Sequence, residues 1–334
     1  MKFITFQRRR GSDRGGLLVD GNRALDLGLG YSRISSGGGS PDDTAGLINT
    51  LRGLSSSILE ILNTGDDALE DCFRLNKMAL DGNLEDCLFS LGDTTLMAPI
   101  PEPPQVIHFN AFEEHARAEL AAISGDPNAA LSPAWHAAPV FHPGNRLGVT
   151  ASGADVVFPE SATEIDFEIQ IAAVLGESIR SGTTEDADDA ILGYSLAIAW
   201  VSRTLQTQLR DLGTGASASR FLGVTLGPCI VTKDSFPRPA EIEVFGAHNG
   251  ERLPSARMED AHFSFPEMIS YASEFSLLPA GTILLAGCYP GGSGLSTGRK
   301  LKTGDTVMAE IDGLGQLNAK IHDRRRSSVF RPRR

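Results

Sequence analysis

The chain has 334 residues, enough for one large domain or for one large domain with a smaller companion. Its formal net charge of −12 argues against nucleic acid as the main partner, because phosphate binding needs a basic surface. No signal peptide, membrane-spanning run or Cys-x-x-Cys pair is present, which favours a reduced, cytoplasmic protein that does not bind membranes.

The N-terminal residues 1–95 are expected to form a small α+β domain. Apolar runs at 1–6 and 15–21 predict short strands. Residues 41–64 predict a helix, because a proline opens a stretch in which apolar residues recur at steps of three and four. Residues 66–80 predict a second helix.

A Pro-rich connector, Pro99–Pro104, is expected to lead into the main body of the protein. We place that larger domain at 96–322, where strands and Gly-rich turns dominate. The last segment, 323–334, is rich in arginine and is expected to be a flexible, solvated tail.

The clearest strand lies at 164–176, with the sequence EIDFEIQIAAVLG. Side chains alternate along a strand, so Asp166, Glu168 and Gln170 project from one face and isoleucine and phenylalanine from the other. Glu168 and Gln170 are then about 7 Å apart on the same side. Two interpretations are open, a solvated outer face and a pair of polar groups that line a pocket.

A second strand is predicted at 193–202, with apolar residues on both faces, which indicates burial on both sides. The residues that follow, 202–211, predict a helical turn. Arg203 and Gln206 share one face of that turn because they are three residues apart.

Six segments, in this order and spacing, resemble the fumarylacetoacetate hydrolase (FAH) family. They are APIPEPPQVIHFNAFEEHAR, IDFEIQIAAVLG, GYSLAIAWVSRTLQ, FLGVTLGPCIVTKD, LLPAGTILLAGCYPGG and LKTGDTVMAEIDGLGQLNAKI. The resemblance implies a fold that is mostly β with some α, a mixed β-sandwich roll with a small N-terminal α+β domain. It also implies a homodimer that acts on a small-molecule dicarbonyl or oxo-acid substrate.

Members of this family use a divalent metal held by four carboxylates, and a helix histidine that activates water. Here His108 stands at the first ligand position, Gln170 at the third and Ala199 at the fourth, and only Glu168 is kept. Val224 replaces a lysine that would neutralise an enolate. The chain thus lacks three of the family's four metal-binding carboxylates and also the positively charged lysine near them.

Other family positions are kept or changed in type. The helix histidine is His115, and Arg203 and Gln206 are retained. Asn110 and His142 stand where the family has tyrosine, and Cys288 stands where it has threonine.

A hard dication binds oxygen ligands, and a single certain carboxylate is a poor site for it. We therefore expect no metal cofactor, although a divalent metal (Mg²⁺, Mn²⁺, Fe²⁺ or Zn²⁺) is not excluded. The softer alternative is a two-histidine, one-carboxylate set for Fe²⁺ or Zn²⁺, made of His108, His142 and Glu168.

The favoured hypothesis is a metal-independent enzyme for isomerisation, cyclisation, dehydration or C–C bond cleavage of a polycarbonyl or oxo-acid. It assigns acid–base catalysis to His115, His108, His142 and Glu168. It assigns substrate binding to Asn110, Gln170, Arg203, Gln206 and Cys288.

Two other hypotheses remain open. One is a non-catalytic protein that binds a ligand or a partner, since drift would also remove a metal site. Retention of His115, Arg203 and Gln206 favours an enzyme over this alternative. The other is a conventional metal-dependent C–C hydrolase or decarboxylase.

Overall fold

The computed structural model describes residues 1–8, 11–35, 57–159, 162–236 and 241–322. Most of the helix predicted at 41–64 and the whole Arg-rich tail at 323–334 lie outside these residues. The described end of the first is a helix, α3 (Ile58–Thr64). The second predicted helix is found as α4 (Asp66–Leu80).

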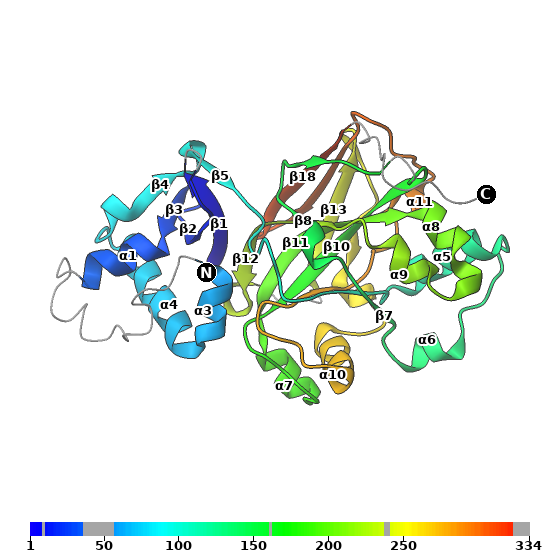
Figure 1. Cartoon of the computed structure of the whole chain (residues 1–334), viewed down its shortest axis with the longest axis horizontal. Coiled ribbons are helices and arrows are strands. Elements are labelled where there is room, and N and C mark those ends of the chain that lie inside the picture. Colours follow the sequence, from blue (N-terminus) through cyan, green and yellow to red (C-terminus); the bar gives the residue numbers. More distant parts are fainter. Residues whose placement is uncertain (9–10, 36–56, 160–161, 237–240, 323–334) are drawn as a thin grey trace.

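The N-terminal lobe is a small antiparallel sheet with helices against it (Figure 1). Its elements are β1 (Lys2–Arg8), β2 (Arg14–Val19), β3 (Arg23–Asp26), α1 (Leu27–Arg33), α3, α4, β4 (Leu88–Ser90) and β5 (Thr94–Leu96). The Pro-rich segment after β5 connects this lobe to the main body, and Thr5 Oγ1 donates a hydrogen bond to the carbonyl oxygen of Pro99 at 2.6 Å.

The main body begins with β6 (Val106–Phe109) and α5 (Glu113–Ser124). It continues with α6 (Pro133–Ala137), β7 (Phe141–Pro143), β8 (Val149–Thr150), β9 (Asp155–Val156), β10 (Ile165–Leu175), α7 (Thr184–Asp189), β11 (Ile191–Ser202), α8 (Arg203–Gln208), α9 (Gly215–Ser219) and β12 (Val224–Thr232). It ends with β13 (Glu243–His248), β14 (Glu251–Arg252), β15 (Ala256–Arg257), α10 (Phe265–Phe275), β16 (Ile283–Leu285), α11 (Gly294–Thr297), β17 (Thr306–Ile311) and β18 (Gly315–Ile321).

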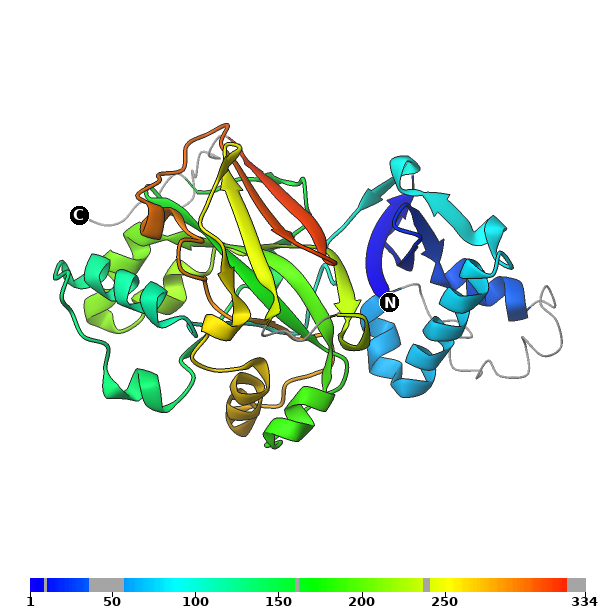
Figure 2. The same cartoon turned by 180° about the vertical axis from the view of Figure 1, so that it is seen from behind.

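Within the described residues the strands form two mixed sheets. The larger has the order β4-β3-β2-β1-β12-β11-β10-β16-β6-β7, and the smaller has the order β14-β13-β17-β18-β9. The smaller sheet packs through β17 and β18 on β11 and β12, as the view from behind also shows (Figure 2). This is the mixed β-sandwich with some helix that the sequence predicts.

The larger sheet crosses from one lobe to the other. Strand β1 pairs with β12, with Phe3 opposite Ile230, and both side chains belong to one apolar core. The predicted boundary between residues 95 and 96 stays a prediction, and the two lobes share a sheet and part of a core.

Three neighbouring strands place Glu168 in one row with Ala199 and Val224. Glu168 of β10 lies opposite Ala199 of β11, and Ala199 lies opposite Val224 of β12. Glu168, which keeps the family's charge, therefore lies in one row across the sheet with Ala199 and Val224, which replace charged residues of the family.

Both faces of β10 are buried, so its polar side is not a solvated outer face. Asp166 is 4% exposed, Glu168 0% and Gln170 1%. Burial of a carboxylate is costly unless it is paired and hydrogen-bonded, so partners for these groups are required. In the described part of the chain, no helix is long and apolar enough to span a membrane.

The shared core gives a test of how the lobes are joined. We expect Phe3→Ala to lower the free energy of unfolding by about 3–5 kcal/mol, because a buried phenylalanine leaves a cavity. Chemical denaturation measures this loss. Phe73→Ala is the control, since Phe73 is 44% exposed and its loss should change stability by less than about 0.5 kcal/mol. Equal effects of the two substitutions would contradict the shared core.

Candidate functional site

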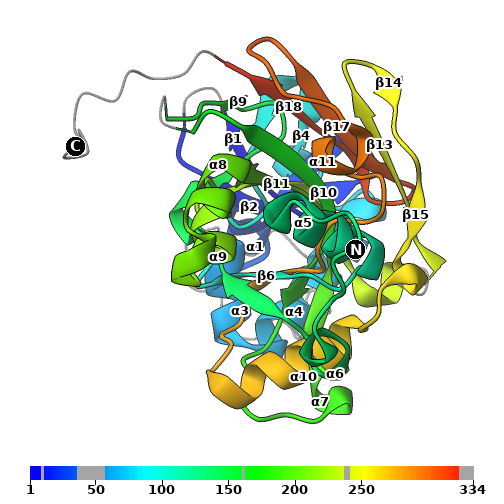
Figure 3. The ribbon, with the colours of Figure 1, turned by 90° about the vertical axis from the view of Figure 1, so that its right-hand side faces the viewer.

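The candidate site lies at the end of the main body where α5, α8, α9 and α11 gather around β10 (Figure 3). Helix α5 brings two site residues inward. His115 and Glu119 are four residues apart, so they lie on one helical face, and both are buried. The helix ends at Gly125, whose left-handed φ of 75° suits glycine.

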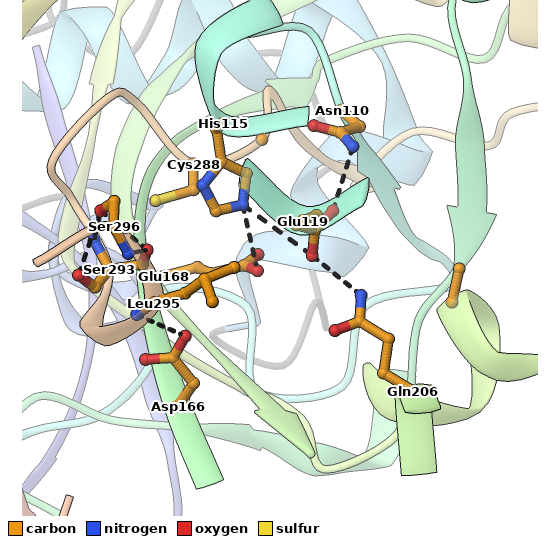
Figure 4. A network of polar contacts seen from close by, with 12 residues as sticks. Asn110, His115, Glu119, Asp166, Glu168, Gln206, Cys288, Ser293, Leu295 and Ser296 are labelled. Atoms are coloured by element: carbon orange, nitrogen blue, oxygen red, sulfur yellow. Dashed lines mark hydrogen bonds and ion pairs between the residues drawn. The ribbon is translucent and has the colours of Figure 1, made fainter. Parts of the chain in front are cut away.

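The centre of the site is an ion pair between His115 and Glu168. The Nε2 atom of His115 lies 3.3 Å from Oε1 of Glu168, and the two side chains point toward each other (Figure 4). The alignment of the pair is poor for a hydrogen bond, and neither ring nitrogen of His115 has a hydrogen-bond partner among the described residues.

The surroundings of the pair favour its charged form. Burial by itself lowers the pKa of His115, but Cys288 and Glu168 outweigh burial and hold that pKa well above its usual value. Burial raises the pKa of Glu168, but Arg220, His115 and Arg203 hold it well below the usual range. These shifts favour a charged imidazolium beside a carboxylate.

Two arginines complete the charge balance. Nη2 of Arg203 lies 2.7 Å from Asp166 and 3.0 Å from Glu168, and Nη1 lies 2.7 Å from Glu119. Arg220 Nη2 lies 2.9 Å from Glu119 Oε1 and 3.5 Å from Glu168 Oε1. Three carboxylates, two guanidinium groups and one imidazolium thus form a nearly neutral buried cluster.

Glu119 is the point where most of these groups meet. Its Oε1 accepts hydrogen bonds from Gln206 Nε2 at 3.0 Å and from Arg203, and its Oε2 accepts one from Asn110 Nδ2 at 3.1 Å. Figure 4 shows Asn110 and Gln206 reaching Glu119 from different elements. Burial raises the pKa of Glu119, but Arg220 lowers it to about 2, so this group is a carboxylate.

Two predicted substrate-binding amides are occupied within the protein. Gln170 Nε2 donates to Glu168 at 3.1 Å, and its Oε1 accepts from the Gly287 N–H at 3.0 Å. Gln206 Oε1 accepts from Arg203 at 2.9 Å, while its Nε2 binds Glu119. These contacts orient the carboxylates, so both side chains act first as positioning groups.

The other two histidines of the prediction are cross-strand neighbours. His108 of β6 lies opposite His142 of β7, and His142 Nδ1 lies 3.2 Å from Ser217 Oγ. Burial and the nearby Arg220 lower the pKa of His108 to about 3 and that of His142 to about 4. Both imidazoles are therefore neutral. The two ring nitrogens of His108 have no hydrogen-bond partner in the described ranges.

Cys288 and Asp166 border the central pair. Cys288 is fully buried, and its Sγ contacts the Tyr289 carbonyl oxygen at 3.3 Å. Burial raises the pKa of the Cys288 thiol, which makes it a poor nucleophile at neutral pH. Asp166 accepts a hydrogen bond from the Leu295 N–H at 3.1 Å, which fixes the Gly-rich segment 291–300 beside the site.

The donor set does not suit a hard dication. Gln170 has its amide oxygen occupied, Ala199 offers no ligand atom, and the Glu168 carboxylate already contacts two guanidinium groups. Ligand atoms of His115, Glu119 and Glu168 do lie within 4.8 Å of one another, which is close enough for a metal. The arginine charges that contact both carboxylates would repel a cation there.

The predicted alternative set for Fe²⁺ or Zn²⁺ is not assembled. His108, His142 and Glu168 are not among the groups of three potential ligands within 4.8 Å that the described residues form. Such a group does occur at the surface, where Glu113, His136 and His262 meet. That surface trio lies outside the buried charge cluster and is a second place where an added metal ion could bind in a titration.

A pocket of about 490 Å³ opens next to the buried cluster. Arg203, Gln206 and Asp166 contribute to its wall, with Arg299 and Lys300 from the segment beside the site. Its volume suits a small molecule, and its wall carries both basic groups, Arg203, Arg299 and Lys300, and acidic groups, Glu164 and Asp166.

The structure brings together His115, Glu168, Arg203, Gln206 and Cys288 from the predicted set. The groups that contact the Glu168 carboxylate are His115, Arg203 and Arg220. Sequence reasoning assigned no role to Glu119, Asp166 or Arg220. The i, i+4 spacing from His115 could have identified Glu119, whereas Arg220 lies in a loop without a periodic signal.

A model of the fumarylacetoacetate (FAA) hydrolase C-terminal family matches residues 106–322. The oxaloacetate tautomerase YisK of Bacillus subtilis is 28% identical over 312 residues, which cover 92% of this chain and 95% of the relative. The mitochondrial oxaloacetate tautomerase fahd2 of Xenopus laevis is 27% identical over 271 residues, which cover 78% of this chain and 77% of the relative.

Solved structures share the fold across most of the chain. The fumarylacetoacetate hydrolase from the psychrophile Exiguobacterium antarcticum has a TM-score of 0.70 at 21% identity, covering 97% of this chain and 100% of that one. The maleylpyruvate hydrolase from Sphingobium sp. SYK-6, in complex with manganese(II) ion and pyruvate, has a TM-score of 0.66 at 20% identity with the same coverage.

The three histidines of the site should titrate differently. We expect ring NMR signals of His115 to report an imidazolium at pH 6.5 and above, while His108 and His142 stay neutral from about pH 5 to 8. Because the folded pKa of His115 is raised, its stabilising effect is complete below the ordinary value of 6.5 and is lost as the pH rises through the folded pKa. Loss of the His115 proton below pH 6.5 would contradict the ion pair.

Proposed function

Because the chain belongs to the fumarylacetoacetate hydrolase family, we propose that it is an enzyme that interconverts tautomers of a small oxo-acid by metal-independent acid–base chemistry. The buried His115–Glu168 ion pair, with a 3.3 Å contact, is the observation that carries the proposal. The names of the two oxaloacetate tautomerases support the reaction class and suggest oxaloacetate as the first substrate to test.

Tautomerisation needs proton transfer and no attacking water. The His115 imidazolium donates its proton to the carbon of the enol, and the C=C π bond supplies the electrons for the new C–H bond. The resulting imidazole then takes the hydroxyl proton as the C=O bond forms. The histidine ends in its starting state, and the nearby Glu168 carboxylate stabilises the imidazolium throughout.

The remaining charges have distinct roles in this proposal. Arg203 binds both Glu168 and Glu119, Gln170 donates a hydrogen bond to Glu168, and Gln206 donates one to Glu119. His108 and His142 remain proton-transfer candidates from the sequence, but burial and Arg220 lower their pKa values, which disfavours a role as general acid. Asn110 and Cys288 remain candidates for substrate contact.

Hydrolysis of a C–C bond is the second candidate reaction. It is favoured by the fold shared with the two hydrolases and by a histidine that could activate water. It would release two products from a longer dicarbonyl substrate, which separates it from tautomerisation in a product assay. We also propose that the chain is a cytoplasmic homodimer. Light scattering of the purified protein tests the oligomeric state.

The enzyme hypothesis is tested with enol-oxaloacetate, whose absorbance decays on conversion to the keto form. We expect catalysed decay in the presence of a chelator, and a loss of about 10²–10⁴-fold with His115→Gln, the usual contribution of general acid–base catalysis. His322→Gln is the control. His322 pairs with Asp155, and neither residue belongs to the site, so this substitution should leave the rate unchanged.

Two results would count against the proposal. Full activity of His115→Gln would remove the histidine from the mechanism. Activity that chelation abolishes and Mg²⁺ or Mn²⁺ restores would favour the conventional metal-dependent reaction instead.

A further inference from the structure

Arg220 is a buried cation placed among carboxylates. It follows α9 and precedes β12, and only 2% of it is exposed. Its Nη2 contacts Glu119 at 2.9 Å and Glu168 at 3.5 Å, and its Nη1 donates to the Ala216 carbonyl oxygen at 3.3 Å. The guanidinium therefore neutralises the same carboxylates that a metal would use.

One hydrogen-bond donor of this group is left over. Arg220 Nε is buried and has no hydrogen-bond partner among the residues that the structure describes. A buried, unsatisfied donor on a charged group costs about 1–3 kcal/mol or more, so such an atom indicates a missing acceptor. Nε–H can only donate, and hence its partner is an acceptor with a free lone pair, such as an oxygen.

Other unsatisfied polar atoms surround the same carboxylates. Within the described ranges, Asn110 Oδ1 and both ring nitrogens of His108 are buried without partners. Asn110 and Arg220 both bind Glu119, and the charge of Arg220 acts on His108. A polar ligand that reaches Arg220 would therefore also meet these groups.

We propose that Arg220 is a built-in cation that takes over the electrostatic role of a divalent metal and donates its Nε–H to an anionic oxygen of an oxo-acid. The ligand class rests on the proposed function, whereas the charge replacement follows from the contacts of Arg220 alone. The enolate and carboxylate oxygens of a 2-oxo-acid have the required negative charge and lone pairs.

The charge replacement predicts a gain of metal binding on removal of the arginine. Arg220→Ala removes one of the two guanidinium charges that contact both Glu119 and Glu168, whose oxygens lie within 4.8 Å of a His115 nitrogen. We expect Mn²⁺ to raise the melting temperature of Arg220→Ala by about 5 °C at a hundredfold excess over its Kd. The parent protein should shift by less than about 1 °C under the same conditions.

The surface trio has to be removed from this measurement. Parent and variant both carry His136→Ala, so that Glu113, His136 and His262 no longer form a three-ligand group. Arg210→Ala is the matched control, because Arg210 is 45% exposed and pairs with its neighbour Asp211. The same Mn²⁺ response in the parent and in Arg220→Ala would overturn the replacement of a metal by Arg220.

Arg220→Lys tests the role of the Nε–H and covers the case in which Arg220→Ala does not fold. Lysine keeps the positive charge, so we expect no Mn²⁺ response. Lysine lacks the planar fork of arginine, so we expect a tenfold or larger rise in the Kd for oxalate, a planar dianion that resembles an enolate. Calorimetry measures that Kd without turnover, so its result is independent of the tautomerase assay. An unchanged Kd for oxalate, or a Mn²⁺ response of Arg220→Lys equal to that of Arg220→Ala, would overturn the proposal.

Discussion

The constraint on which this structure depends is charge balance in a buried space. Asp166, Glu168 and Glu119 are each at most 5% exposed, and none of them could remain ionised there without counter-charges. Arg203, Arg220 and the imidazolium of His115 supply three. Gln170 and Asn110 donate hydrogen bonds to Glu168 and Glu119 and help to hold these carboxylates in position.

The sheet explains how the cluster can be so compact. Glu168 lies in the middle of β10, and the strand beside it offers Ala199, which leaves space for larger groups from outside the sheet. Helix α5 supplies His115 and Glu119, and the segments after β11 and α9 supply the arginines. A rigid sheet thus carries one charge, and helices and loops deliver its partners, an arrangement that suits a preorganised site.

The departures from the family pattern have a common physical meaning. Loss of carboxylates at the third and fourth ligand positions alone would only weaken metal binding. The structure adds guanidinium groups that contact the remaining carboxylate, so the negative charge is neutralised without an ion. A neutral core and an exchangeable proton on His115 are compatible with acid–base chemistry, and a pocket with Arg299 and Lys300 in its wall lies beside the cluster.

The sequence by itself determined the elements and the family. The alternation in β10 and the periodicity of α4 follow from local side-chain patterns, which is why both are found where they were predicted. The ordered family segments also identified His115, Glu168, Arg203 and Gln206 as members of one site.

Only the tertiary structure decided which side chains of the site contact each other. The sequence assigned Arg220 no partner, because contacts between residues 52 positions apart depend on how loops fold back onto a sheet. Burial was also undetermined, since the polar face of β10 reads the same whether it meets solvent or buried partners. The pKa directions, and with them the protonated His115 and the neutral His108, follow from that burial and from those partners, which local patterns do not encode.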